Sequence, residues 1–141
     1  MPRAVLDANV LISALLTPRG ATARVLLALR DGAFELIVSP LLMAELERTL
    51  RRQKFRKYVT EEDATEYVDL IRRLSVMVDD PPAPSVRLSR DPGDEYLISL
   101  ARAAHADALV SGDAHLLSLR SRIPVRSPSA FLGELERNPP R

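Results

Sequence analysis

The feature that most constrains the fold is a short apolar run that ends abruptly at an acidic residue. Residues 4–6 are all apolar, and Asp7 follows them directly. An apolar run without polar alternation is typical of a strand buried on both faces, and such strands belong to parallel sheets covered by helices. Ligands of these sheets bind beyond the carboxyl ends of the strands, which is where Asp7 would lie. Two interpretations stay open: Asp7 caps the helix that follows, or it helps to hold a cation.

Similar runs recur along the chain, separated by segments with helical spacing. The further predicted strands are residues 34–38, 76–78, 108–110 and 123–125. The predicted helices cover residues 10–16, 21–30, 40–52, 60–74, a stretch from residue 94, 115–119 and 128–136. In the third of these, Leu42, Leu46 and Leu50 form an apolar stripe. Alternating strands and helices predict an α/β fold with a mostly parallel sheet covered on both faces.

Length and composition narrow the class of protein. With 141 residues and no internal repeat, the chain is expected to form a single domain over residues 1–141. The chain has no cysteine, which excludes disulfides, thiolate catalysis and cysteine-bound zinc. No apolar run approaches the ~18 residues of a membrane span, and no signal peptide is evident. We therefore expect a protein of the cell interior. Residues 79–92 contain four prolines and predict a long loop.

Acidic residues are placed where several predicted elements meet the same edge of the sheet. Asp113 follows the strand at residues 108–110 after a short polar turn, as Asp7 follows the first strand. Asp94 opens a helix, where the helix dipole favours an anion. Glu45 lies one turn inside the helix after the second strand. The alternatives are that the aspartates only cap helices and that Glu45 pairs with a neighbour one turn on, Arg48 or Thr49.

A cluster of carboxylates without cysteine suits a hard divalent cation. Carboxylate oxygens are preferred ligands of Mg²⁺ and Mn²⁺, which keep bound water and leave room for a phosphate oxygen. Without a cation, such acids would raise one another's pKa, because like charges disfavour ionisation. A bound metal ion also lowers the pKa of its water and orients a scissile phosphate. The pattern therefore predicts phosphodiester cleavage.

A basic segment follows Glu45. Residues 48–57 hold six basic side chains and no acidic one, although the net charge of the whole chain is only +1. Such a segment can bind a nucleic-acid backbone, or it can be an ordinary solvated surface. The residues that we expect to contact RNA phosphates are Arg48, Arg51, Arg52 and Lys54.

Four segments, taken together, resemble the PIN domain family, and in particular the VapC-like toxins of bacterial and archaeal toxin–antitoxin pairs. They are VLDANVL at residues 5–11, SPLLMAEL at 39–46, RDPGDEYL at 90–97 and LVSGDAHLL at 109–117. The resemblance implies a Rossmann-like α/β/α sandwich and an Mg²⁺- or Mn²⁺-dependent endoribonuclease. It also implies a homodimer and, for a toxin, a separate antitoxin protein. The cell-interior location expected from composition makes the protein cytoplasmic in this interpretation.

The resemblance also assigns roles to particular residues. The acidic residues that would bind metal and support catalysis are Asp7, Glu45, Asp94 and Asp113. Asn9 and Ser111 would orient these carboxylates and the metal-bound water. Glu95 adjoins Asp94 and is the alternative for the third acidic role.

A second function class remains open on the same fold. The chain could be a non-catalytic module that binds RNA or assembles with other proteins, because fold alone does not determine function. The presence of all four acids argues against this alternative. Receiver domains and aspartyl phosphatases fit less well, since Asn9 stands where the phosphatases require a second aspartate.

Overall fold

The chain forms one five-stranded sheet in which every pair of neighbouring strands is parallel. A computed structural model describes residues 1–82 and 92–137. The strands are β1 (Arg3–Leu6), β2 (Glu35–Val38), β3 (Ser75–Met77), β4 (Ala108–Val110) and β5 (Val125–Arg126). Their order across the sheet is β3-β2-β1-β4-β5. This arrangement confirms the predicted α/β class with a parallel sheet.

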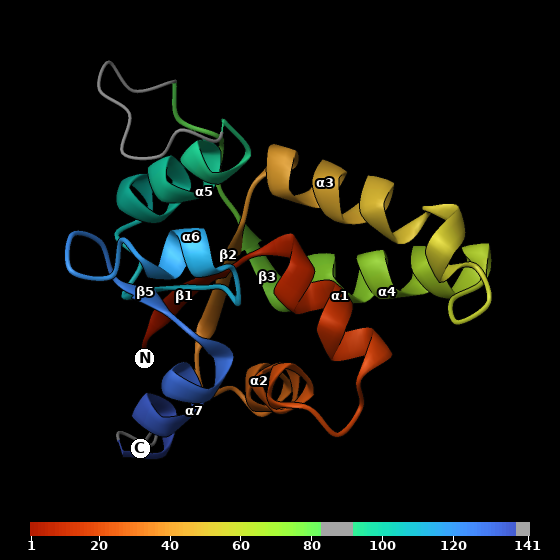
Figure 1. The fold of residues 1–141 in the computed structure, drawn as a ribbon, viewed down its shortest axis with the longest axis horizontal. Helices are drawn as coiled ribbons and strands as arrows, with labels where there is room; N and C mark the ends of the chain where they lie inside the picture. The colour runs from red at the N-terminus through yellow and green to blue at the C-terminus, as the bar shows by residue number, and fades with distance from the viewer. Residues whose placement is uncertain (83–91, 138–141) are drawn as a thin grey trace.

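Helices cover both faces of the sheet. They are α1 (Ala8–Leu16), α2 (Ala21–Arg30), α3 (Pro40–Leu50), α4 (Glu61–Leu74), α5 (Pro92–Ala103), α6 (Ala114–Leu117) and α7 (Pro128–Arg137), with a 3-10 turn, η1 (Gln53–Phe55), between α3 and α4. In Figure 1, α5 lies above the strands, and α2 and α7 lie below them. Helices α3 and α4 run side by side away from the sheet. The fold is therefore the sandwich that the sequence predicted.

Local sequence signals determine where several helices begin. Ser39 accepts a hydrogen bond from the backbone N–H of Leu42, with Pro40 at the first position of α3. Thr60 and Asp63 form a capping box at the start of α4. The predicted strand at residues 123–125 was displaced: β5 begins after Pro124, because proline has no N–H to donate to a strand ladder.

The core lies between the central strands and the helices. Residues 4–6 of β1 and all of β4 are buried, as expected for strands covered on both faces. The predicted stripe on α3 is also buried, with Leu42, Leu46 and Leu50 at most 2% exposed. Strand β3 lies at the edge of the sheet, where Val76 and Met77 are 42% and 47% exposed. The buried strands β1 and β4 are adjacent, and this brings together the acidic residues that follow them.

Two other findings bear on the predictions. Among the residues that the structure describes, no single helix is long and apolar enough to cross a membrane. Only α1 and α2 together have the length and apolar composition of a membrane span, and the two helices are bent by 98° relative to one another. Most of the predicted loop at residues 79–92 lies outside the described residues, because these omit residues 83–91.

Candidate active site

Asp7 occupies the point where β1 passes into α1. Its Oδ1 accepts a hydrogen bond from the backbone N–H of Asn9 at 3.2 Å, so Asp7 is the N-cap of α1. Its Oδ2 accepts a hydrogen bond from the Ser111 hydroxyl at 2.9 Å. Asp7 is only 7% exposed. The capping interpretation is therefore correct, but it accounts for only one of the two carboxylate oxygens.

Ser111 connects two of the predicted acids. It directly follows β4, and its Oγ accepts the backbone N–H of Asp113 at 3.0 Å while its hydroxyl donates to Asp7. Asp113 in turn caps α6, since its Oδ1 accepts the backbone N–H of His115 at 2.9 Å. Asp113 is exposed, whereas Ser111 is completely buried. The side chain of Asn9 is exposed, and its contact with Asp7 is made by the backbone amide.

Glu45 reaches the same region from α3. Its Oε2 accepts a hydrogen bond from the phenolic hydroxyl of Tyr96, which lies on α5 and is 51 positions away in the sequence. In the described residues Glu45 therefore pairs with Tyr96, and not with Arg48 or Thr49 on its own helix, which was the alternative. The contact with Tyr96 joins α3 to α5.

Asp94 and Glu95 both lie in the first turn of α5. The helix begins at Pro92, so Asp94 is its third residue and not, as predicted, the residue that opens it. Asp94 and Glu95 are 8% and 6% exposed, so burial does not distinguish the two candidates for the third acidic role. The hydrogen bond from Tyr96 to Glu45 brings this helix start to the acidic region.

The acids influence one another electrostatically. Burial raises the pKa of Asp7, the hydrogen bonds from Ser111 and Asn9 lower it, and the charges of Glu45 and Asp113 raise it again. Burial also raises the pKa of Tyr96, and so do its hydrogen bond to Glu45 and the nearby carboxylates. The phenol of Tyr96 is therefore neutral and acts as a donor. Asp7, Glu45 and Asp113 therefore form what we call the acidic cluster, with side chains from the end of β1, from α3 and from the turn between β4 and α6.

Asp80 is an acidic residue of this edge that the sequence interpretation missed. It follows β3, and its Oδ2 accepts the backbone N–H of Leu41 at 2.9 Å, near the start of α3. Its Oδ1 is buried and accepts no hydrogen bond from the described residues. Its charge also contributes to the raised pKa of Tyr96. The sequence carries the signal, since Asp79 and Asp80 follow the apolar residues 76–78, but the four prolines of residues 79–92 favour a loop there.

The carboxylates of Asp7, Glu45 and Asp113 are suitable ligands for a hard divalent cation, although each of them forms a hydrogen bond within the protein. Within residues 1–82 and 92–137, no three acidic or histidine side chains are arranged to hold one ion together. Glu45 is bonded to Tyr96, and Asp113 is bonded to a backbone amide. The charges of Glu45 and Asp113 nevertheless raise the pKa of Asp7, and a bound divalent cation would offset that repulsion. All the available ligands are carboxylate oxygens, as Mg²⁺ and Mn²⁺ prefer.

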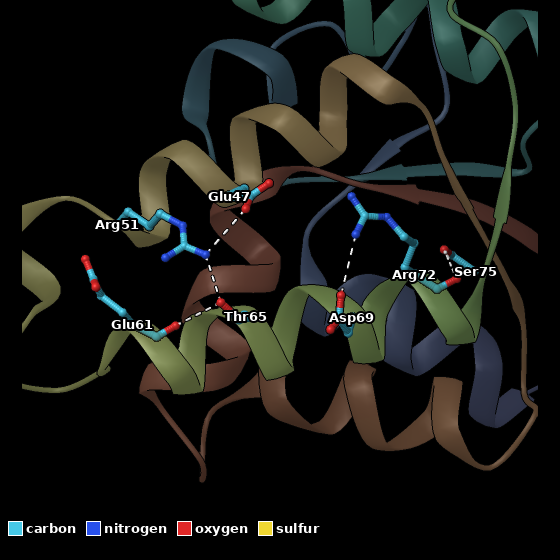
Figure 2. A network of polar contacts seen from close by, with 7 residues as sticks. All are labelled: Glu47, Arg51, Glu61, Thr65, Asp69, Arg72 and Ser75. Carbon is cyan, nitrogen blue, oxygen red and sulfur yellow. Dashed lines mark hydrogen bonds and ion pairs between the residues drawn. The ribbon is translucent and has the colours of Figure 1, made fainter.

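The predicted RNA-contacting residues lie at and beyond the far end of α3. Arg48, Arg52 and Lys54 are exposed. The guanidinium of Arg51 instead bonds the hydroxyl of Thr65 on α4 at 2.9 Å and a carboxylate oxygen of Glu47 at 3.4 Å, as Figure 2 shows. Arg51 therefore ties α3 to α4. Arg48 and Arg52 are exposed to solvent, and the ammonium of Lys54 lies 4.9 Å from the centroid of the Phe55 ring.

Comparisons with known proteins identify one family and one curated relative. A family model described as the PIN domain matches residues 3–115. The uncharacterised protein MJ1680 of Methanocaldococcus jannaschii is 27% identical over 146 residues, which cover 96% of this chain and 92% of the relative.

Two solved structures share the fold. One is PAE2754 of Pyrobaculum aerophilum, with a TM-score of 0.71, 17% identity and 97% of both chains covered. The other is VapBC2 of Rickettsia felis bound to a DNA fragment from its promoter, with a TM-score of 0.61, 17% identity, and 89% of this chain and 98% of the other covered.

Proposed function

Because the chain belongs to the PIN domain family, we propose that it is a metal-dependent endoribonuclease whose active site is the acidic cluster at the carboxyl ends of β1 and β4. The observation that carries the proposal is the environment of Asp7. This carboxylate is buried and bonded to Ser111, and the charges of Glu45 and Asp113 raise its pKa. Such an arrangement is costly for stability and useful for holding a cation.

The residues that would hold Mg²⁺ or Mn²⁺ are Asp7, Glu45, Asp94 and Asp113, with Glu95 as the alternative to Asp94. When bound, the cation would supply an activated water and a counter-charge for the scissile phosphate. Ser111 orients Asp7, because its hydroxyl occupies one carboxylate oxygen. The backbone amide of Asn9 holds the other oxygen.

RNA binding would rest on the exposed basic side chains beyond Glu45. Arg48, Arg52 and Lys54 are exposed to solvent, where they could contact phosphates, and such contacts supply affinity with little sequence information. Lys54 would leave its contact with the ring of Phe55 to do so. Arg51 would support them indirectly, by fixing the end of α3 against α4.

The proposal extends to a biological role. The motifs resemble those of VapC-like toxins, and VapBC2 shares the fold. We therefore propose that residues 1–141 are a single toxin domain that acts on RNA in the cytoplasm, forms a homodimer and is neutralised by a separate antitoxin protein.

The test is a cleavage assay on a labelled structured RNA with Mg²⁺, with Mn²⁺ and with EDTA. The wild-type protein should cleave only with metal, and Asp7→Asn should abolish cleavage while the protein stays folded. Asp31→Asn is the matched control, because Asp31 is an exposed carboxylate that pairs with Arg30 outside the cluster. Wild-type cleavage by Asp7→Asn would overturn the proposal.

A second candidate function is a non-catalytic RNA-binding module. The observation that favours it is the lack, among the described residues, of three ligating side chains around one point. In a filter-binding titration, this module would bind RNA equally well with Mg²⁺ and with EDTA, and it would never cleave.

A further inference from the structure

One hydrogen bond spans the acidic cluster between two helices that are distant in the sequence. The hydroxyl of Tyr96 donates to Oε2 of Glu45 across 51 positions. Figure 1 shows the first turns of α3 and α5 on the same side of the sheet, facing one another. Tyr96 is half-buried, so this hydroxyl is partly shielded from competing water.

The hydrogen bond to the carboxylate of Glu45 comes from Tyr96 on α5 and not from its own helix, α3. It is half-buried on α3, and a glutamate has three rotatable side-chain bonds. A glutamate without a partner must lose this rotational freedom when it binds a cation, which weakens binding. A hydrogen bond to one oxygen removes part of that freedom beforehand and leaves the other oxygen available. Carboxylates that ligate metals are commonly held in this way.

We propose that Tyr96 is the positioning residue of Glu45: its hydroxyl holds Oε2, so that Oε1 is the oxygen available to a divalent cation. The proposal rests on the proposed function, since it assigns Glu45 to metal binding. The inference goes beyond the proposed function by naming a neutral residue on which the affinity for the cation depends. Tyr96 is not among the predicted site residues.

The chain contains a second tyrosine that serves as a matched control. The hydroxyl of Tyr67 on α4 also donates to a distant acceptor, the backbone carbonyl oxygen of Leu11 in α1. Both phenols are shielded from solvent, and both hydrogen bonds join two helices. Only Tyr96 has a carboxylate as its acceptor, so only Tyr96 should influence a cation.

The experiment measures Mn²⁺ binding without RNA, by the electron paramagnetic resonance signal of free Mn²⁺. The variants are Tyr96→Phe, Tyr67→Phe, Glu45→Gln and the double variant Tyr96→Phe/Glu45→Gln, each checked by circular dichroism. Tyr96→Phe should weaken Mn²⁺ binding by about tenfold or more, as for other partners of ligating groups. Tyr67→Phe should lower the melting temperature and leave the Mn²⁺ affinity unchanged.

The double variant separates positioning from a general structural effect. If Tyr96 acts through Glu45, replacing it should have little further effect once Glu45→Gln is present. Wild-type affinity in Tyr96→Phe would overturn the inference, and so would losses that simply multiply in the double variant.

The outcomes also distinguish this inference from the proposed function. If the wild-type protein binds Mn²⁺ and cleaves RNA while Tyr96→Phe binds Mn²⁺ equally well, the nuclease stands and the role of Tyr96 falls. If the wild-type protein binds no Mn²⁺, the metal-dependent nuclease falls, and the inference falls with it.

Discussion

The Ser111 hydroxyl donates a 2.9 Å hydrogen bond to Oδ2 of Asp7, which lies 104 positions earlier in the chain. The contact exists because β1 and β4 are neighbours in register, with Leu6 opposite Val110. A backbone hydrogen bond lies beside this contact, because the N–H of Asp7 donates to the carbonyl oxygen of Val110 at 2.9 Å. Two strand ends are thereby joined at the acidic cluster.

Replacing Ser111 with alanine should destabilise the protein and disturb Asp7. The change removes a donor from the buried carboxylate and an acceptor from the N–H of Asp113. Unfolding in urea should show a loss of about 1–3 kcal/mol, which is typical when buried polar groups lose a partner. Without this hydrogen bond the pKa of Asp7 should also rise further, because the bond lowers it in the wild-type protein. Ser129→Ala, at an exposed position, should unfold like the wild-type protein.

The charge of Asp7 should make the metal-free protein less stable as pH rises. Burial and the charges of Glu45 and Asp113 raise the pKa of Asp7, so the folded protein holds this proton more tightly than the unfolded chain does. Stability therefore falls between pH ~4, the ordinary range of an aspartate, and the raised pKa of the folded state.

Asp7→Asn tests this pH dependence, because asparagine caps helices as well as aspartate does but carries no charge. In EDTA at pH 7, the variant should melt a few degrees above the wild-type protein. The difference should shrink as the pH is lowered toward 4, where Asp7 takes up its proton. Parallel melting curves for the two proteins across this range would contradict the expectation.

Asp80 should stabilise the start of α3 through its bond to the N–H of Leu41. Asp80→Ala should lower the free energy of unfolding by about 1 kcal/mol, as for the removal of other helix caps, and Asp80→Asn should lower it less because the amide oxygen can still accept. Chemical denaturation measures both. Asp79→Ala is the control, since the neighbouring residue is exposed. Equal destabilisation in the two alanine variants would show that the hydrogen bond to Leu41 is not the cause.

The basic residues near the end of α3 should separate into two groups. Replacing Arg52 and Lys54 with alanine should flatten the salt dependence of RNA binding, by a slope of about 0.7 for each phosphate of a single strand that the variant no longer neutralises. Arg51→Ala should lower the melting temperature instead, because Arg51 bonds Thr65 and Glu47. Binding titrations at several salt concentrations, with thermal melts, check both expectations. An unchanged slope in the Arg52 and Lys54 variant would remove these residues from the RNA interface.

Much of the fold could be predicted from the sequence because it depends on contacts between residues only a few positions apart. The caps at Asp7, Ser39 and Thr60 are local, because each bonds an amide only two or three residues away. The buried strands were evident from uninterrupted apolar runs, and the α3 stripe from its spacing. Element boundaries differed from the predicted ones by at most two residues, and at β5 the local reason is Pro124, which has no N–H for the strand ladder.

The composition of the cluster depended on the order of the strands. Nothing near Glu45 in the sequence indicates Tyr96, which is 51 positions away. The family resemblance implied that Ser111 orients carboxylates, and the tertiary structure decided that its hydrogen-bond acceptor is Asp7, 104 positions earlier. The same holds for Asp80, which reaches Leu41 only because β3 lies beside β2. The sequence alone determined the class of fold, the family resemblance and the acidic residues near one sheet edge. The tertiary structure decided which of these side chains touch, because a hydrogen bond needs atoms within about 3 Å and only the packing of distant segments brings them that close.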